Sequence, residues 1–151
     1  MVYCSFSSPV GLLLISADER GICALDFDDN GEILKDSNHH IELLKKELEA
    51  YFAGKLKNFS VPLHPKGTFF QQGVWDVLQS IPYGETISYS REAELLKQPK
   101  ATRAVANANG KNKIAIVIPC HRVIAKSGGI GGYSGGLWRK EYLLALEQKY
   151  R

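Results

Sequence analysis

One cysteine of the chain lies among groups that could make it reactive. Cys120 follows Pro119 and is followed by His121 and Arg122. A thiol attacks as a thiolate, and a neighbouring histidine or positive charge is the usual means of stabilising that thiolate. A cysteine that simply packs in the core is the commoner situation for a lone thiol. The residue types alone therefore leave two interpretations open, an activated nucleophile and a structural cysteine.

A carboxylate near the C-terminal end could complete such a nucleophile. Glu147 comes three residues after Leu144 and four after Leu143, so it shares their stripe on a helix predicted over residues 137–149. A carboxylate on an apolar stripe should be partly buried and should have a partner. If the partner is His121, the carboxylate fixes the tautomer of an imidazole that activates the thiol. An ion pair with Lys or Arg in solvent is an equally favoured alternative.

The other cysteines and histidines give a weaker signal. Cys4 and Cys23 fall on predicted neighbouring strands, where they could face each other, bind a metal or pack, and we expect packing. The histidines at positions 39, 40 and 64 show no close spacing of the kind found in zinc sites. We therefore expect no metal site.

Composition indicates a globular protein with an uneven distribution of charge. The 151 residues are 44% hydrophobic, enough for one domain or two small ones, and the net charge is +3. Residues 1–67 carry 7 basic and 10 acidic side chains, whereas residues 68–151 carry 12 and 6. No acid lies between Lys97 and Arg139. This stretch is either a solvated basic surface or a patch that contacts phosphates.

No membrane span or signal peptide is evident, so we expect a cytoplasmic protein. The first part of the chain predicts a small α/β domain over residues 1–54, with a small antiparallel sheet and one helix. Its strands are predicted over 2–7, 11–16 and 21–27. Its helix is predicted to begin after a cap at Ser37 or Asn38, to run to Phe52 and to be ended by Gly54. Residues 55–67, with two prolines, are predicted to be a linker.

Residues 68–151 predict a mainly α-helical domain. Helices are expected over 70–78, from the Ser88 cap to Lys97, over 100–109 and over 137–149. The second and third of these, joined by a turn at Gln98 and Pro99, predict a helix-turn-helix, although a plain helical hairpin fits the spacing as well. The apolar run 114–118 predicts a buried strand that leads to Cys120.

Several motifs in this domain resemble those of one family. Residues 118–124 read Ile-Pro-Cys-His-Arg-Val-Ile, and residues 81–89 read Ile-Pro-Tyr-Gly-Glu-Thr-Ile-Ser-Tyr. With Arg103-Ala104-Val105 and the segment 132–137, they are similar in order and spacing to the O6-alkylguanine-DNA alkyltransferases, also called methylated-DNA–protein-cysteine methyltransferases. The resemblance covers residues 68–147. The N-terminal third resembles the family only in shape, as its variable, ribonuclease H-like α/β domain.

The resemblance implies DNA repair by a single-turnover enzyme. The partner would be double-stranded DNA containing O6-alkylguanine, with O4-alkylthymine as a candidate second lesion. The protein would bind the minor groove as a monomer, flip the damaged nucleotide and move the alkyl group to Cys120. No cofactor is expected.

The resemblance also implies roles in the chemistry. Cys120 would accept the alkyl group, and His121 would deprotonate it through a water while Glu147 orients the imidazole. Tyr89 would help to rotate the nucleotide and would donate a proton towards the leaving guanine. Asn112 would tie the recognition helix to the active-site strand; the next residue is Lys113 where many members have proline, a departure expected to loosen the turn.

Other positions would contact DNA or the base. Arg103 would enter the base stack, with Tyr89 assisting. The remaining DNA contacts would come from small residues near the start of the recognition helix and from two lysines, namely Ala101, Thr102, Ala104, Lys100 and Lys126. The pocket for the alkylated base would be formed by Val123, Gly131, Tyr133 and Ser134.

Three other functions compete with this interpretation. An alkyltransferase-like binding protein normally lacks the acceptor cysteine, so Cys120 argues against it. A cysteine hydrolase would need an oxyanion hole and a peptide or glutamine pocket, for which no motif is evident. A helix-turn-helix regulator would leave the cysteine motif and Glu147 without a purpose.

Overall fold

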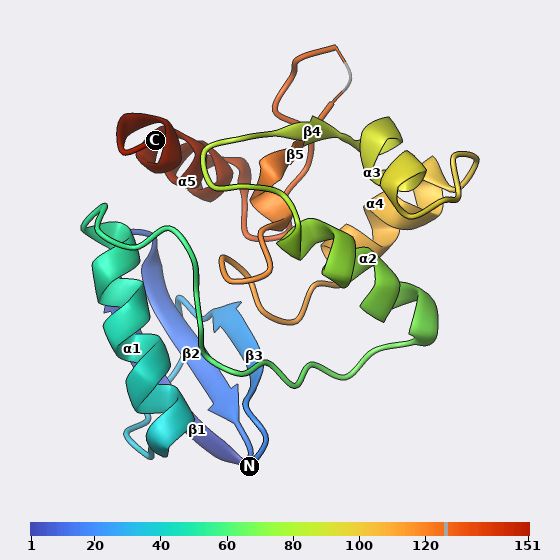
Figure 1. Cartoon of the computed structure of the whole chain (residues 1–151). Coiled ribbons are helices and arrows are strands. Elements are labelled where there is room, and N and C mark those ends of the chain that lie inside the picture. The colour runs from blue at the N-terminus through green and yellow to red at the C-terminus, as the bar shows by residue number, and fades with distance from the viewer. Residues whose placement is uncertain (126) are drawn as a thin grey trace. The chain divides into compact units, whose positions relative to one another are not determined.

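The computed structural model describes residues 1–125 and 127–151, and these form two compact units (Figure 1). The first unit contains Met1–Lys66 and Lys113–Ala115, and the second contains Gly67–Asn112 and Ile116–Arg151. None of the described helices combines the length and the apolarity that a membrane span requires.

The first unit is an antiparallel sheet packed against one helix, as the sequence predicts. Strands β1 (Val2–Ser8), β2 (Gly11–Ala17) and β3 (Ile22–Phe27) pair in that order. Helix α1 (His39–Phe52) begins at Asn38, whose side chain accepts a hydrogen bond from the backbone N–H of Ile41. Its buried side chains include Ile41, Leu44, Leu48 and Tyr51. These fall at helical spacing and form the core with the inward face of the sheet.

The segment that precedes the second unit is held against this sheet. The backbone N–H of Ile22 donates to the carbonyl of Pro62 at 2.9 Å, and the N–H of His64 donates to the carbonyl of Ile22 at 2.7 Å. Both oxygens of buried Glu47 on α1 accept hydrogen bonds from the backbone N–H of Ser60, and one also accepts from that of Val61. Residues up to Lys66 therefore belong to the first unit by their contacts.

The second unit consists mainly of four helices. These are α2 (Phe69–Gln79), α3 (Tyr89–Leu95), α4 (Thr102–Gly110) and α5 (Leu137–Lys149). A parallel pair of two-residue strands, β4 (Ile87–Ser88) and β5 (Val123–Ile124), and a short 3-10 helix η1 (Cys120–Arg122) complete the unit. A small antiparallel sheet with a helix, followed by a mainly helical unit, is the predicted fold, which is confirmed.

Helices α3 and α4 form the two halves of the helix-turn-helix. Ser88 caps α3 as predicted, accepting a hydrogen bond from the N–H of Arg91. The helix ends at Leu95, two residues earlier than predicted. Lys97, just beyond the C-cap Leu96, has a left-handed φ of 64°, and the N–H of Gln98 donates to the carbonyl of Ala93 at 3.0 Å. Helix α4 then begins at Thr102, two residues later than predicted, and no side chain caps it.

The predicted strand over residues 114–118 is not present. Ile114 makes a single parallel bridge with Leu25, and turns follow. Ile116 has a φ of 74°, which no strand residue adopts and which a β-branched side chain rarely tolerates. Three of the five side chains, Ile114, Ile116 and Ile118, are almost fully buried. The apolar run therefore indicates a buried segment but not its backbone conformation. The strand prediction is wrong because a run of buried residues has the same pattern in a strand and in an irregular segment.

Replacing Glu47 with alanine should destabilise the first unit. The change removes the acceptors of two backbone N–H groups and of the Ser60 hydroxyl, which donates to Glu47 at 2.9 Å. Buried donors without a partner cost about 1–3 kcal/mol, so we expect a loss of about 2 kcal/mol in denaturant unfolding. Glu49→Ala, which removes an exposed carboxylate from the same helix, is the control and should change stability by less than about 0.5 kcal/mol. Equal losses in the two variants would contradict the structural role of Glu47.

Candidate active site

Cys120 lies at the start of η1, where the chain turns sharply. Pro119 precedes it with φ −82° and ψ 65°, and the N–H of Cys120 donates to the carbonyl of Ile118 at 2.8 Å. This three-residue turn places the thiol in a nearly buried position, with 8% of the residue exposed. The fixed φ of proline favours such a turn, so the sequence immediately before Cys120 determines where its side chain is held.

The side chain of Asn112 donates a hydrogen bond to the thiol. Its Nδ2 donates to the carbonyl of Ile118 at 2.7 Å and to Sγ of Cys120 at 3.2 Å. Asn112 follows α4 directly, and its own N–H donates to the carbonyl of Asn109 at 3.2 Å. The turn therefore keeps its hydrogen bonds although Lys113 follows.

His121 and Glu147 form a buried hydrogen-bonded pair. The distance between Nε2 of His121 and Oε2 of Glu147 is 2.6 Å, and both residues are essentially inaccessible to solvent. An ionised carboxylate only accepts hydrogen bonds, so Nε2 must carry the proton and Nδ1 must carry the lone pair. Nδ1 is buried and has no hydrogen-bond partner within residues 1–125 and 127–151. The imidazole therefore presents a basic nitrogen that the protein itself leaves available.

Arg122 holds the same carboxylate from a second direction. Its Nε donates to Oε1 of Glu147 at 2.8 Å and one terminal nitrogen donates to Oε2 at 3.1 Å, while the other donates to the carbonyl of Ile81 at 2.7 Å. The N–H of Gly84 adds a bond to Oε1 at 3.2 Å. Glu147 therefore lies against His121, and it also pairs with an arginine; because Arg122 is buried, this pair differs from the ion pair in solvent that was the alternative.

The charges of this cluster fix the state of the histidine. Burial acts to raise the pKa of Glu147, but hydrogen bonds and charge from His121 and Arg122 hold it well below its ordinary value. Burial lowers the pKa of His121, and the pull of Glu147 in the other direction is partly cancelled by the charge of Arg122. At neutral pH the cluster therefore contains an ionised Glu147, a charged Arg122 and a neutral His121 that can accept a proton.

The thiol itself is protonated in the resting site. Burial raises the pKa of Cys120, and the hydrogen bond from Asn112 and the charge of Lys140 offset only part of this effect. Cys120 is therefore not a standing thiolate, and its proton must leave at the time of reaction.

A pocket of about 470 Å³ opens beside Cys120. Residues from α3, α4 and the loop before α5 line it with the cysteine, namely Tyr89, Ala106, Asn109, Gly110, Gly132, Tyr133 and Ser134. Two of the four residues predicted for the pocket, Tyr133 and Ser134, are among them. Ala106, Asn109, Gly110 and Gly132 were not predicted.

The other two predicted pocket residues, Val123 and Gly131, do not line the pocket but lie against residues around it. The carbonyl of buried Val123 accepts a hydrogen bond from Nζ of Lys140 at 2.7 Å. Gly131 has a φ of 75°, and a Cβ at this position would lie 2.9 Å from the hydroxyl of Tyr89. Burial raises the pKa of Tyr89, so its hydroxyl keeps its proton at neutral pH. Only glycine allows the loop to approach Tyr89 so closely.

Lys140 is a site residue that the sequence analysis did not select. It is fully buried on α5, and its Nζ donates to the carbonyls of Val123 and Gly132, the second at 3.0 Å. Lys140 thereby holds the pocket loop, and burial lowers its pKa. A signal was available, because Lys140 lies seven residues before Glu147 and so on the same helical stripe.

The predicted DNA-contacting residues gather around the start of α4. Arg103 and Ala104 are exposed in its first turn, Ala101 and Thr102 are half-buried, and Lys100 is exposed just before them. Lys126, also predicted to contact DNA, lies outside the described residues.

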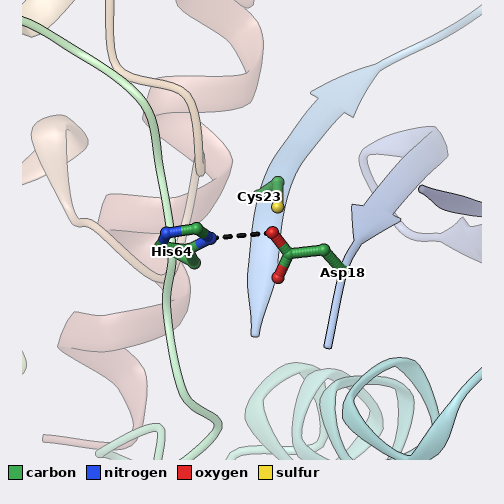
Figure 2. Close-up of side chains that lie close together, drawn as sticks. All are labelled: Asp18, Cys23 and His64. Atoms are coloured by element: carbon green, nitrogen blue, oxygen red, sulfur yellow. Dashed lines mark hydrogen bonds and ion pairs between the residues drawn. The ribbon is translucent and has the colours of Figure 1, made fainter. Parts of the chain in front are cut away.

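A separate cluster in the first unit joins Asp18, Cys23 and His64 (Figure 2). Oδ1 of Asp18 accepts from the N–H groups of Arg20 and Gly21, and Oδ2 lies 2.8 Å from Nδ1 of His64. The ligand-type atoms of the three side chains lie within 4.8 Å of one another, so together they could hold a metal ion. Their sequence positions gave no signal of this grouping.

Neither Cys4 nor Cys23 forms a disulfide; like Cys120, both are free and buried. This arrangement matches the expectation that the two cysteines pack. Burial, with smaller effects from neighbouring Asp18, raises the pKa of Cys23.

Comparison with known proteins identifies the family. A family model described as the DNA-binding domain of 6-O-methylguanine DNA methyltransferase matches residues 69–149, and that of its ribonuclease-like domain matches residues 1–65. The methylated-DNA–protein-cysteine methyltransferase of Methanosarcina acetivorans is 45% identical over 153 residues, which cover 97% of this chain and 98% of that protein. The constitutive enzyme of Bacillus subtilis is 41% identical over 156 residues, covering 97% and 94%.

A solved structure agrees with these relatives. The Mycobacterium tuberculosis OGT in complex with DNA superposes with a TM-score of 0.90 at 42% identity, covering 98% of this chain and 93% of that one. Matches to both family models, near-complete coverage of the relatives and the cysteine motif lead to the same result. The chain therefore belongs to the 6-O-methylguanine DNA methyltransferase family, and the family predicted from the motifs around Cys120 is confirmed.

Proposed function

We propose that this protein repairs double-stranded DNA by moving the alkyl group of O6-alkylguanine to Sγ of its own Cys120. The observation that carries the proposal is the position of Cys120, which borders a base-sized pocket and precedes a buried His121–Glu147–Arg122 cluster. A cysteine next to a histidine that a carboxylate orients could serve either alkyl transfer or hydrolysis. Because the relatives of this chain are methylated-DNA–protein-cysteine methyltransferases, alkyl transfer is the favoured reaction.

The first step removes the proton of Cys120. Nδ1 of His121 accepts it through a bridging water, and the imidazolium that forms is stabilised by Glu147, which already holds Nε2–H. Arg122 keeps the carboxylate in place while this charge develops. Asn112 donates to Sγ, and this hydrogen bond becomes stronger as the sulfur becomes negative.

The second step transfers the alkyl group. The thiolate attacks the alkyl carbon in line with its bond to O6, an S–C bond forms, and the C–O6 electron pair stays with guanine. Tyr89, which retains its proton because burial raises its pKa, donates that proton to the departing base. Tyr89 then regains a proton from solvent, and His121 releases to solvent the proton that it took from Cys120. In the net reaction the thiol loses one proton and guanine gains one.

The reaction consumes the protein. A thioether on Cys120 has no good leaving group, and none of the proposed residues supplies a nucleophile to displace it. Each molecule therefore acts once, and no cofactor takes part.

Access to the buried alkyl carbon requires that the nucleotide leave the helix. Extrusion costs a few kcal/mol, less for a lesion whose base pair is weakened. The exposed Arg103 would fill the vacated space from the minor groove, while Thr102 and the neighbouring Ala101 and Ala104 allow close approach of α4. Lys100 and Lys126 would contact phosphates without sequence preference. The pocket loop with Tyr133 and Ser134 would cover the flipped base.

The protein acts as a monomer in the cytoplasm, and O4-alkylthymine is a candidate second lesion that can present its alkyl carbon to the same thiolate. Val123 contributes a carbonyl with a second lone pair that can accept from the guanine amino group while Lys140 occupies the first.

Mixing the protein with duplex DNA that contains O6-methylguanine should increase its intact mass by one methyl group. Peptide mapping should place the methyl group on Cys120, because this is the cysteine that borders the pocket. Cys120→Ser should gain none, and Cys23→Ser, which removes another buried thiol, should be methylated like the wild type. An unchanged wild-type mass in excess lesion would contradict the proposed function.

Arg103→Ala should slow repair of duplex DNA about 10- to 100-fold, because the vacated space in the helix is no longer filled. Transfer from the free alkylated base, which needs no extrusion, should be almost unchanged. Lys111→Ala removes an exposed positive charge just after α4 and serves as the control for charge alone. Single-turnover rates on both substrates give the comparison, and equal losses on duplex and free base would argue against the wedge.

Without DNA, the thiol of Cys120 should react slowly with iodoacetamide at pH 7. Because burial raises its pKa, the rate should rise with pH and should still be rising at pH 9. Peptide mapping with time measures the rate at Cys120, with the urea-unfolded chain as the reference for an accessible thiol. A plateau near pH 7 would indicate a preformed thiolate and would contradict the proton transfer described above.

A further inference from the structure

Two buried polar side chains join the helices of the helix-turn-helix beside the pocket. Glu92 on α3 is fully buried and Asn109 on α4 is 7% exposed. Nδ2 of Asn109 donates to Oε1 of Glu92 at 2.7 Å. Asn109 also lines the pocket that contains Cys120, so this pair connects the packing of α3 and α4 with the wall of the site.

The other oxygen of each side chain is unsatisfied. Oε2 of Glu92 and Oδ1 of Asn109 are both buried, and neither has a hydrogen-bond partner among the residues that the structure describes. An ionised carboxylate and an amide oxygen are both acceptors, so they cannot satisfy each other. One proton on Oε2 changes this, because a neutral acid can donate to Oδ1 while it accepts from Nδ2. Acid and amide then form a reciprocal pair with every polar atom used.

Burial and the hydrogen bond from Asn109 shift the pKa of Glu92, and no positive charge among the described residues contributes to that shift. Of the elements packed against α3, α2 contributes only exposed Asp76 and α4 only exposed Arg103 as charged groups, and β4 and β5 have none. Tyr89 on its own helix and Cys120 are titratable groups that interact with Glu92, and the buried Lys140 of α5 lies with Nζ 6.0 Å from the centre of the Tyr89 ring. Isolated buried charges are costly, which favours the neutral form.

We propose that Glu92 is a positioning residue that acts as a neutral carboxylic acid, forming a reciprocal hydrogen-bonded pair with Asn109 that holds the pocket-lining end of α4 against α3. The amide of Asn109 then has one fixed orientation at the pocket wall. Replacing the proton by a negative charge would leave two buried acceptors facing the same interface and would separate the helices that carry the pocket.

The charge state of Glu92 also affects the pKa of the Cys120 thiol. Burial raises the pKa of Glu92 to about 7, and the hydrogen bond from Asn109 lowers it only in part. An ionised Glu92 raises the pKa of Cys120 and so opposes thiolate formation. The neutral acid therefore favours alkyl transfer, and this part of the inference rests on the proposed function.

The test is the pH dependence of unfolding in Glu92→Gln. Glutamine can form the same reciprocal pair but cannot ionise. At a pH between the ordinary carboxyl pKa and about 7, Glu92 keeps its proton in the folded protein and loses it in the unfolded chain. The free energy of unfolding of wild type therefore decreases as the pH rises through this window and becomes constant above about pH 7. The unfolding equilibrium constant of wild type should therefore rise relative to Glu92→Gln between pH 5 and 7, by up to about tenfold per pH unit near pH 6 and less steeply at either end. Glu94→Gln, which removes an exposed carboxylate from the same helix, should follow wild type.

A constant ratio of the two equilibrium constants between pH 5 and 8 would overturn the proposal, as would a Glu92→Gln chain that does not fold. The functional readout is the rate of methyl transfer at pH 6 and pH 9. Glu92→Gln should equal wild type at pH 6 and exceed it at pH 9, and a loss of activity at pH 6 would also overturn the positioning role. The unfolding measurement uses no DNA, so failure of the proposed function, seen as an unmethylated wild type, is distinguished from failure of this inference.

Discussion

The carboxylate of Glu147 is the interaction on which the rest of the second unit depends. It accepts hydrogen bonds from His121, from two nitrogens of Arg122 and from the N–H of Gly84, and it is removed from solvent. A buried charge with a poor set of partners is costly, whereas here each oxygen has at least two donors. Because its donors come from two other segments, one side chain on α5 joins this helix to the active-site turn and to the segment before β4.

This arrangement allows the cysteine to be unreactive at rest and still have a base available for the reaction. A thiolate exposed at rest would be open to adventitious oxidation and alkylation, and a single-use protein would be lost to such reactions. Here burial keeps the thiol protonated, and burial together with the smaller effect of the charge of Arg122 keeps His121 neutral and able to act as a base, although Glu147 acts in the other direction. The thiol therefore becomes a nucleophile only when its proton is transferred, and His121 is the base held in place for that transfer.

The regular elements are more predictable from the sequence than the irregular segments. Ser88 and one of the pair Ser37 and Asn38 are predicted as helix caps because their side chains suit that role, and Glu147 is a candidate because it interrupts an apolar stripe. The run 114–118 was misjudged as a strand, since burial on all sides looks the same in a strand and in a turn. The reciprocal pairing of Glu92 and Asn109 was not evident, because a glutamate seventeen residues from an asparagine gives no local pattern.

The position of Glu147 has a consequence for the order in which the site is assembled during folding. Until α5 has docked, the imidazole beside the Cys120 thiol has no carboxylate to orient it. The sulfur acquires an oriented base only when α5 has formed and docked. A chain in which α5 has not docked therefore has a cysteine without an oriented base, so the folding of the second unit and the assembly of its reactive group are the same event.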